Sequence, residues 1–309
     1  MLITALQKLF AVNPGSNTLS MFSIDHRDPT KLVMLGKPIS VLGEFPTTVA
    51  ASKKHKIVCV GSTGAKAGVA CSSFSSRGLE PMDNLRAFDI QQTTPPLGPT
   101  NTVSQVFFSE DESKLFSTVK GDPTKNNTGF LAAFDVEQSK GSAACVSQQG
   151  SLSSPNGTAV LFGSSAIPGS SDLVVTDASF GAAILSIDQD DKASVKGKGV
   201  VSGQKATCWV AVSPATNSAF VTDVATNRLV QVSLDDASIQ NEIDLSANGD
   251  PGLIDLRAAG DFVYALSPGN GTTSPAITVV NAVSKQQVQH LQLQSLGVDA
   301  NAQGMAVLD

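Results

Sequence analysis

The stretch DLVVTDASFGAAILSID, residues Asp172–Asp188, decides the fold together with the similar stretch SAFVTDVATNRLVQVSLD, residues Ser218–Asp235. Each contains a short apolar run that ends in Thr-Asp, a four-residue turn, and a second apolar run that ends at an acid. This pattern predicts a hairpin of two strands that bury alternate side chains, with Asp and Asn forming the turn. The second stretch begins 46 residues after the first. Because a repeat of roughly 40 to 50 residues is typical of propellers and solenoids, the two hairpins indicate a repeat protein.

The same unit, a series of apolar runs separated by Gly, Pro, Asn and Asp, occurs six times along the chain. We expect its first strands around Thr48, Gln105, Val160, Trp209, Ile254 and Met305. These positions are 45 to 57 residues apart, close to the roughly 40 to 50 residues of a four-stranded propeller blade.

The two ends of the chain complement each other. The closing NAQGMAVLD, residues 301–309, has the form of a first strand without the rest of its unit, and the N-terminal unit lacks such a strand. A blade completed from both ends leaves no unpaired sheet edge. We therefore predict an all-β fold, a six-bladed β-propeller of four-stranded antiparallel blades whose first blade is closed by the C-terminal strand, in one domain over residues 1–309. A parallel β-helix is the alternative, but it would not explain the antiparallel hairpins or the complementary ends.

Composition limits the partners of this chain of 309 residues. Charged residues make up 16% and the net charge is −6, so there is no basic field for nucleic acid or for an anionic membrane surface. No apolar run approaches the roughly 20 residues of a spanning helix. The opening MLITALQKLF lacks the cationic start and long apolar core of a signal peptide. We expect no nucleic-acid or membrane partner, and a secreted monomer whose signal peptide is absent from this sequence.

Two of the four cysteines occupy matching positions. Cys59 and Cys71 flank VGSTGAKAG, and a hairpin centred near Ala65 would place the two thiols opposite each other. Cross-strand neighbours at that spacing can form a disulfide, although two buried free thiols are equally compatible with the pattern. Cys145 and Cys208 have the surroundings of isolated core cysteines.

Long loops are expected on one face of the propeller. Turns between the second and third strands of a blade share a face with the connections to the next blade, and here these include GSTGAKAG, KGDPTKNNTG, SPGNGTTSP and QQTTPPLGPTN. Because functional residues concentrate on such loops, we expect a small-molecule ligand on this face. Phe180, in the turn ASFG, is placed to contact it.

Polar residues at the heads of the first strands would surround the mouth of the central channel. They are Glu44, Asn101, Asn156, Lys205, Asp250 and either Asn301 or Gln303. Converging oxygen atoms are what Ca²⁺ requires, and Glu44, Asn156 and Asp250 are the possible metal ligands. The other interpretation is that Asn and Asp head these strands because they suit turns. Lys205 argues against a metal, because its ammonium would repel the ion.

Metal-free acid–base chemistry is the second possibility at this mouth. Lys205, Arg257, Glu44 and Asp250 are the candidates for moving protons and stabilising an oxyanion. The three histidines, His26, His55 and His290, are expected at the surface, and Trp209 in the core between blades. No nucleophile elbow, zinc-spaced Cys and His set, phosphate loop or dinucleotide fingerprint occurs.

Over nearly its whole length the chain resembles the secreted fungal propellers described as muconate-cyclase-like or lactonase-like, and most closely the branch that includes a propeller encoded in the trichothecene toxin cluster. The residues that carry this resemblance are NTLSMFSID, KIVCVGSTGAKAGVAC, FVTDVATNRLVQVSL and GDPGLIDLRAAGDFVYALSPGNGT. The true carboxymuconate-lactonizing enzymes would imply seven blades and a His, Arg and Glu set, whereas this chain shows six units and no histidine at the expected mouth. A looser resemblance links Asn156 in PNG and Glu44 in GEFP to the metal motifs of the calcium-dependent gluconolactonase group.

Two functions from different classes remain. The first is a secreted propeller that binds a small molecule, such as a secondary metabolite, at the channel mouth through Glu44, Asn101, Asn156, Phe180, Lys205, Asp250 and Arg257. The second is a lactonase or cycloisomerase that acts on a small lactone at the same place, with or without Ca²⁺. A protein interaction scaffold is a third possibility.

Overall fold

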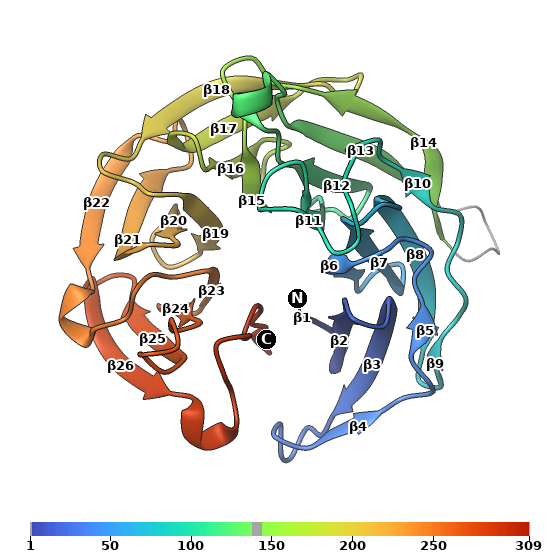
Figure 1. The fold of residues 1–309 in the computed structure, drawn as a ribbon, viewed down its shortest axis with the longest axis horizontal. Coiled ribbons are helices and arrows are strands. Elements are labelled where there is room, and N and C mark those ends of the chain that lie inside the picture. The colour runs from blue at the N-terminus through green and yellow to red at the C-terminus, as the bar shows by residue number, and fades with distance from the viewer. Residues whose placement is uncertain (1, 138–143, 309) are drawn as a thin grey trace. The chain divides into compact units, whose positions relative to one another are not determined.

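The computed structural model describes residues 2–137 and 144–308, and these form six antiparallel sheets (Figure 1). The chain divides into two compact units. Unit 1 contains the residues up to Ser154 and the turn Gln189–Lys192; unit 2 contains Pro155–Asp188 and Ala193–Val307. Each unit contributes three consecutive sheets. The fold is a six-bladed β-propeller of four-stranded antiparallel blades, as predicted, whereas the single domain over the whole chain stays a prediction.

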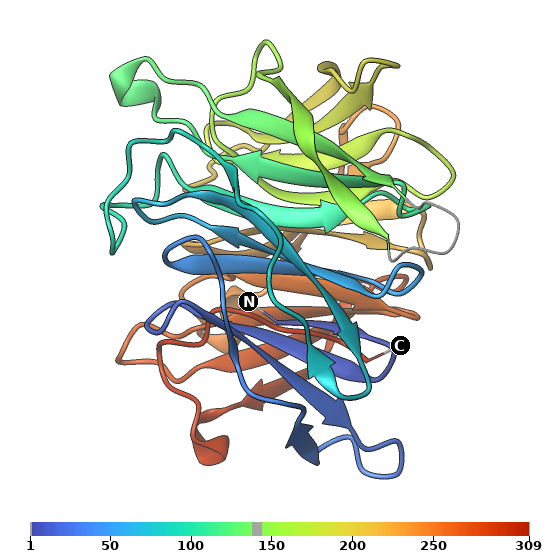
Figure 2. The same ribbon diagram turned by 90° about the vertical axis from the view of Figure 1, so that its right-hand side faces the viewer.

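Unit 1 holds the first three blades. Blade 1 has the strand order β1 (Leu2–Ala5), β2 (Lys8–Asn13), β3 (Thr18–Ile24), β4 (Leu32–Met34), with β5 (Ile39–Ser40) also on β3. Blade 2 has the order β6 (Pro46–Ser52), β7 (Ile57–Ser62), β8 (Gly68–Ser75), β10 (Arg86–Ala87), with β9 (Gly78–Leu79) on β8. Blade 3 consists of β11 (Val103–Phe108), β12 (Lys114–Val119), β13 (Phe130–Glu137) and β14 (Cys145–Ser153). The loop between β12 and β13 contains the short 3₁₀ helix η1 (Pro123–Lys125) and extends away from these strands (Figure 2).

Unit 2 holds the last three blades. Blade 4 consists of β15 (Leu161–Ala166), β16 (Leu173–Asp177), β17 (Gly181–Ile187) and β18 (Ala193–Val200). Blade 5 consists of β19 (Thr207–Ser213), β20 (Ser218–Asp223), β21 (Thr226–Ser233) and β22 (Ile239–Asp244). Blade 6 consists of β23 (Asp255–Ala259), β24 (Phe262–Ser267), β25 (Ala276–Asn281) and β26 (Gln286–Gln292), flanked by the 3₁₀ helices η2 (Ser246–Asn248) and η3 (Gln294–Leu296). No helix in the described residues is long and apolar enough to span a membrane.

The second strands of blades 2, 4 and 5 are buried on both faces, not on one. Every residue of β7, β16 and β20 is buried, so the alternation of buried and exposed side chains expected in the two hairpins is wrong. The physical reason is that each of these strands also contacts the first strand of the following blade, as β16 contacts β19 and β20 contacts β23. A strand covered on both faces is a continuous apolar run, which is what the sequence contains.

The repeated Thr-Asp pair at the end of the second strand has a structural task. In blade 4, one carboxylate oxygen of Asp177 accepts the backbone N–H groups of Ala159 and Val160, at 2.7 and 3.0 Å. In blade 5, Asp223 accepts the backbone N–H of Lys205 at 2.7 Å. The Asp thus holds the residues just before the first strand of its own blade. The motif that sets the repeat is therefore a clamp between neighbouring strands.

The first blade is not closed by the C-terminal strand. Its first strand is β1, which pairs with β2, and residues 302–308 form no strand. Leu6 and Gln7 join β1 to β2 with positive φ angles of 52° and 54°, a primed turn made without the Gly, Asn or Asp that usually reveals one. The C-terminal segment packs on blade 6 instead: the Met305 N–H donates to Asp255, and Met305 lies in an apolar cluster with Leu266 and Leu293.

The predicted disulfide is confirmed. Cys59 in β7 lies directly opposite Cys71 in β8, and the two sulfurs are bonded. Cys208 is buried, as expected for a core cysteine, but Cys145 is exposed on β14, and neither forms a disulfide. Its strand is the last of its sheet, which the spacing of apolar residues did not show.

Candidate functional site

The first strands of unit 2, β15, β19 and β23, lie side by side (Figure 1). They bring together two aromatic rings and a guanidinium group. Phe162 packs edge-on against Trp209 with ring centres 5.7 Å apart, and the guanidinium carbon of Arg257 lies 5.5 Å from the centre of the Trp209 ring. At this distance the electron-rich face of the indole attracts the cation. We call Phe162, Trp209, Asp255 and Arg257 the first-strand cluster.

Asp255 and Arg257 are two residues apart in β23, so their side chains leave the same face of the sheet. Nη1 of Arg257 donates to Oδ1 of Asp255 at 3.0 Å, and Oδ2 of Asp255 accepts the Met305 N–H at 2.6 Å. The Asp255 side chain is only 3% exposed. Burial raises the pKa of its carboxyl group, against the opposing effects of the Arg257 charge and the two backbone N–H donors, Met305 and Leu256.

Two hydrogen-bond donors of the cluster have no partner. Nε1 of Trp209 and Nη2 of Arg257 are shielded from solvent, and neither is hydrogen-bonded to any described residue. A buried donor without an acceptor costs about 1 to 3 kcal/mol, and native structures rarely leave one unpaired. What the cluster lacks is an acceptor. An acceptor oxygen brought to either donor would satisfy it.

The two predicted site residues of unit 1 connect loops. Oε2 of Glu44 accepts the Thr94 hydroxyl at 2.6 Å, and Oε1 lies 3.8 Å from Nζ of Lys66. Asn101 has a positive φ of 51° and accepts a hydrogen bond from the Asn127 amide at 2.7 Å. Both side chains therefore already bind neighbouring loops, in agreement with the interpretation of strand-head residues as turn formers.

The predicted residues of unit 2 are dispersed, and only Arg257 belongs to the first-strand cluster. Asn156 and Lys205 are exposed. Phe180 is 8% exposed and lies beneath Lys198, whose Nζ is 3.7 Å from the ring centre. Its ring is therefore already covered by Lys198, and contact between Phe180 and a ligand stays a prediction.

Asp250 is engaged by a histidine. Both carboxylate oxygens lie within hydrogen-bond distance of Nε2 of His290 in β26, at 3.2 and 3.1 Å, and the Asp250 side chain is 3% exposed. His290 is half-buried, not at the surface as expected, and the ring nitrogens of His55 are also shielded. His290 pairs with Thr278 on the outer two strands of blade 6, so this contact directs Asp250 away from the first strand β23.

A calcium site at Glu44, Asn156 and Asp250 stays a prediction, and Asp250 already has another partner. Asp250 has both oxygens committed to His290, and no group of three or more His, Cys, Asp or Glu side chains in the described part of the chain could hold a metal. Ca²⁺ takes six to eight oxygen ligands.

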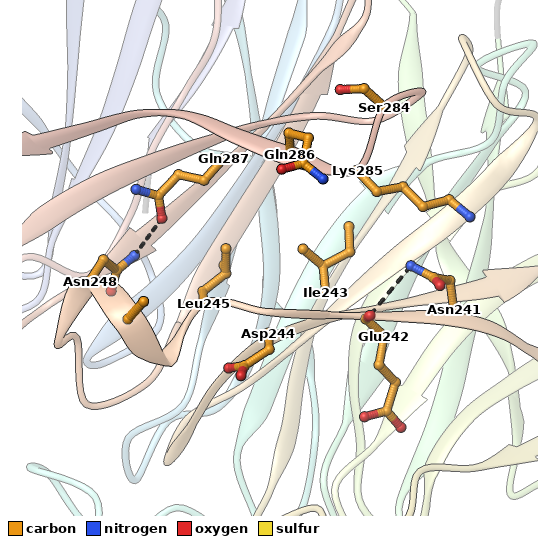
Figure 3. Close-up of a pocket in the computed structure, with 11 residues that line it drawn as sticks. Asn241, Glu242, Ile243, Asp244, Leu245, Asn248, Ser284, Lys285, Gln286 and Gln287 are labelled. Carbon is orange, nitrogen blue, oxygen red and sulfur yellow. Dashed lines mark hydrogen bonds between the residues drawn. The ribbon is translucent and has the colours of Figure 1, made fainter.

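A hollow of about 620 Å³ lies between β22 and the turn before β26, away from the residues of the first-strand cluster (Figure 3). Its polar lining is largely satisfied. Nδ2 of Asn248 donates to Oε1 of Gln287 at 2.9 Å, and Glu242 forms an ion pair with Arg228 at 2.7 Å. Acidic, basic and amide groups are mixed and exposed around it, so it has the character of a solvated crevice between two blades.

The sequence predicts that Trp209 lies in the core but does not reveal which residues contact it. Its burial is confirmed, at 7% exposed, but the contacts with Phe162 and Arg257 depend on how the three sheets pack. The sequence offers one sign of these contacts. The single Trp lies in one first strand, and Asp-Leu-Arg, residues 255–257, lies in the next.

No protein-family model matches this chain, and no curated protein matches its sequence. Solved structures do match it. They include a candidate 6-phosphogluconolactonase from Bacteroides uniformis, with 14% identity, 92% of this chain and 82% of that chain covered, and a TM-score of 0.68. A protein from Lactobacillus plantarum has 12% identity, the same coverage and a TM-score of 0.65. A chain of the nidogen/laminin complex has 10% identity, with 93% and 94% covered and a TM-score of 0.57.

These likenesses bear on the fold alone, because the identities are low. The link to a fungal branch and to secondary metabolism stays a prediction.

Proposed function

We propose that this chain is a secreted β-propeller that binds a small organic anion at the first-strand cluster of unit 2. The observation that carries the proposal is the pair of buried, unpartnered donors, Nε1 of Trp209 and Nη2 of Arg257. A carboxylate has two acceptor oxygens and a charge opposite to that of Arg257, so it matches both needs. Phe162 and Trp209 supply apolar rings for the body of the ligand. Secretion is supported by the disulfide, since such bonds persist in oxidising compartments.

The site proposed here differs from the mouth expected from the sequence. Of the seven predicted ligand-binding residues it keeps Arg257 and adds Trp209, Phe162 and Asp255. The role of Asp255 is to hold Nη1 of Arg257, which leaves Nη2 available to the ligand. Met305 in turn holds Asp255 from the C-terminal segment.

Trp209 is the single Trp of the chain, so its fluorescence reports on this site alone. We expect benzoate to change the emission in a saturable way and the neutral isostere benzamide to bind at least about tenfold more weakly, because it lacks the charge that Arg257 recognises. Arg257→Gln should weaken benzoate binding by a similar factor. Lys205→Gln, at the head of β19, should leave it unchanged.

Two results would reject the proposal. Equal titrations by benzoate and benzamide would show that charge is not recognised. Loss of binding in Lys205→Gln with normal binding in Arg257→Gln would move the site to the strand heads.

A lactonase is the second candidate function, favoured by the raised pKa of Asp255 beside Arg257. In this hypothesis Nε1 of Trp209 and Nη2 of Arg257 would stabilise the oxyanion formed when water attacks the lactone carbonyl. The Asp255 carboxylate would take the proton from that water, the ring C–O bond would break, and the proton would pass to the leaving alkoxide to give a hydroxy acid. Titration of acid released from δ-valerolactone, with and without EDTA, tests this. Absence of turnover would eliminate the lactonase and leave the binding function standing.

A further inference from the structure

The outer strand of blade 6 is an open sheet edge. Strand β26, with the sequence QQVQHLQ, pairs with β25 on one side and with no other strand in the described chain. Six of its seven residues are exposed, and it contains no Lys, Arg, Asp or Glu. Unpaired N–H and C=O groups along such an edge form a template for another strand, which proteins normally block with charge, shortness or a cover.

The other outer strands carry these protections. β4 and β10 have three and two residues. β18 contains Lys196 and Lys198, and β22 contains Glu242 and Asp244. Each of these edges is therefore too short or too charged to pair readily with a copy of itself.

Strand β14 is uncharged as well, but side chains cover it. Arg86 donates to the backbone carbonyls of Val146 and Ser147, and Nζ of Lys192 donates to that of Leu152 at 3.0 Å. Its central Gly150 also has low strand propensity. Among the outer strands described, β26 thus combines full length, exposure and absence of formal charge.

Apolar side chains accompany this edge. Val288 and Leu291 in β26 are 54% and 41% exposed, and Val283 and Leu296 on either side are 60% and 69% exposed.

We propose that β26 pairs antiparallel with β26 of a second copy of this chain, forming a twofold-symmetric dimer. An uncharged strand rich in Gln is complementary to itself, since each Gln side chain both donates and accepts hydrogen bonds. A twofold axis through the strand pair lets every contact occur twice and closes the assembly at two chains. The strand contains no Lys, Arg, Asp or Glu that would favour a partner of opposite charge over a second copy. The dimer replaces the monomer expected from composition.

The dimer is weak. One added strand pair falls short of the about 800 Å² that each partner buries in a standard interface, so we expect a dissociation constant on the order of 10 to 100 μM. The proposal is independent of the ligand site, because β26 is the outer strand of its sheet and β23 is the first.

Sedimentation velocity from about 5 to about 500 μM protein brackets that range and tests the pairing. We expect a monomer at the low end and a dimer at the high end. Gln289→Lys places like charges near each other across the twofold axis and should raise the dissociation constant at least about tenfold. Gln240→Lys makes the same substitution on the already charged edge strand β22 and should change nothing.

Hydrogen exchange locates the interface independently. Amides of β26 should gain protection as the concentration rises, whereas those of β22 should not. A monomer throughout the concentration range would overturn the proposal. So would a dimer that Gln289→Lys leaves intact, because the association would then use another surface.

Discussion

Replacing Asp177 by asparagine tests the clamp that sets the repeat. Asp177 is completely buried, with Oδ2 accepting the N–H groups of Ala159 and Val160 and Oδ1 accepting the N–H and hydroxyl of Ser179. An amide keeps one acceptor oxygen. If that oxygen stays with Ser179, the NH₂ group faces the N–H groups of Ala159 and Val160 and leaves both without an acceptor.

The magnitude follows from those two lost bonds. Each buried donor left unpaired costs about 1 to 3 kcal/mol, so Asp177→Asn should lower the free energy of unfolding by about 4 kcal/mol. Urea unfolding followed by circular dichroism measures this loss. The control is Asp261→Asn, at an exposed position, which should stay within about 0.5 kcal/mol of the unsubstituted protein. A loss below about 1 kcal/mol in Asp177→Asn would refute the clamp, because water or relaxation would then be satisfying those two groups.

Three further predictions concern the disulfide and two carboxyl groups. The double substitution Cys59→Ser and Cys71→Ser should lower the free energy of unfolding by about 2 to 4 kcal/mol, measured in urea, and thiol titration of the denatured parent protein should find Cys145 and Cys208 alone. Hydrogen bonds from Ser109 and Ser113 lower the pKa of Asp111 to about 2. The stability that Asp111 contributes is therefore present above about pH 4 and is lost as the pH falls through 2. In a series of unfolding measurements, Asp111→Asn should be less stable than the parent protein at pH 6 and equally stable at the acid end. Burial raises the pKa of Asp255. Its contribution to stability is therefore present below about pH 4 and is lost as the pH rises through the folded-state pKa. The stability of the parent protein relative to Asp255→Asn should decrease with rising pH, and an increase would contradict this.

Much of the blade architecture is predictable because it depends on residues near one another in the chain. The hairpin β20–β21 is visible in SAFVTD and TNRLVQVS, and the opposed thiols of Cys59 and Cys71 follow from a symmetric turn. One feature that the sequence does not predict, the strand β1, also depends on a local turn. The turn at Leu6 and Gln7 has the backbone geometry of a primed turn but not its residues, so the sequence shows no sign of β1 and predicts instead that residues 301–309 form the first strand of blade 1.

The candidate site was much less predictable. Polar residues at strand heads predict a mouth, but loop contacts already engage the side chains of Glu44 and Asn101. Lys205 is held through its backbone N–H, which donates to Asp223. The partner of Asp250 is His290, 40 residues away, and no local pattern connects the two. The same is true of the contact between Trp209 and Arg257.

By itself the sequence determined the all-β class, the six repeats and the antiparallel hairpins, and it placed Cys59 opposite Cys71, because apolar runs, turn chemistry and spacing act over about ten residues. The tertiary structure alone decided that the C-terminal segment packs on blade 6, that Asp177 and Asp223 clamp first strands, and that Trp209 and Arg257 share a buried environment with two unpaired donors. Those outcomes depend on how separate sheets pack face to face. Packing sets which polar groups lose contact with water, and a group that loses water must find a partner that the linear sequence does not reveal.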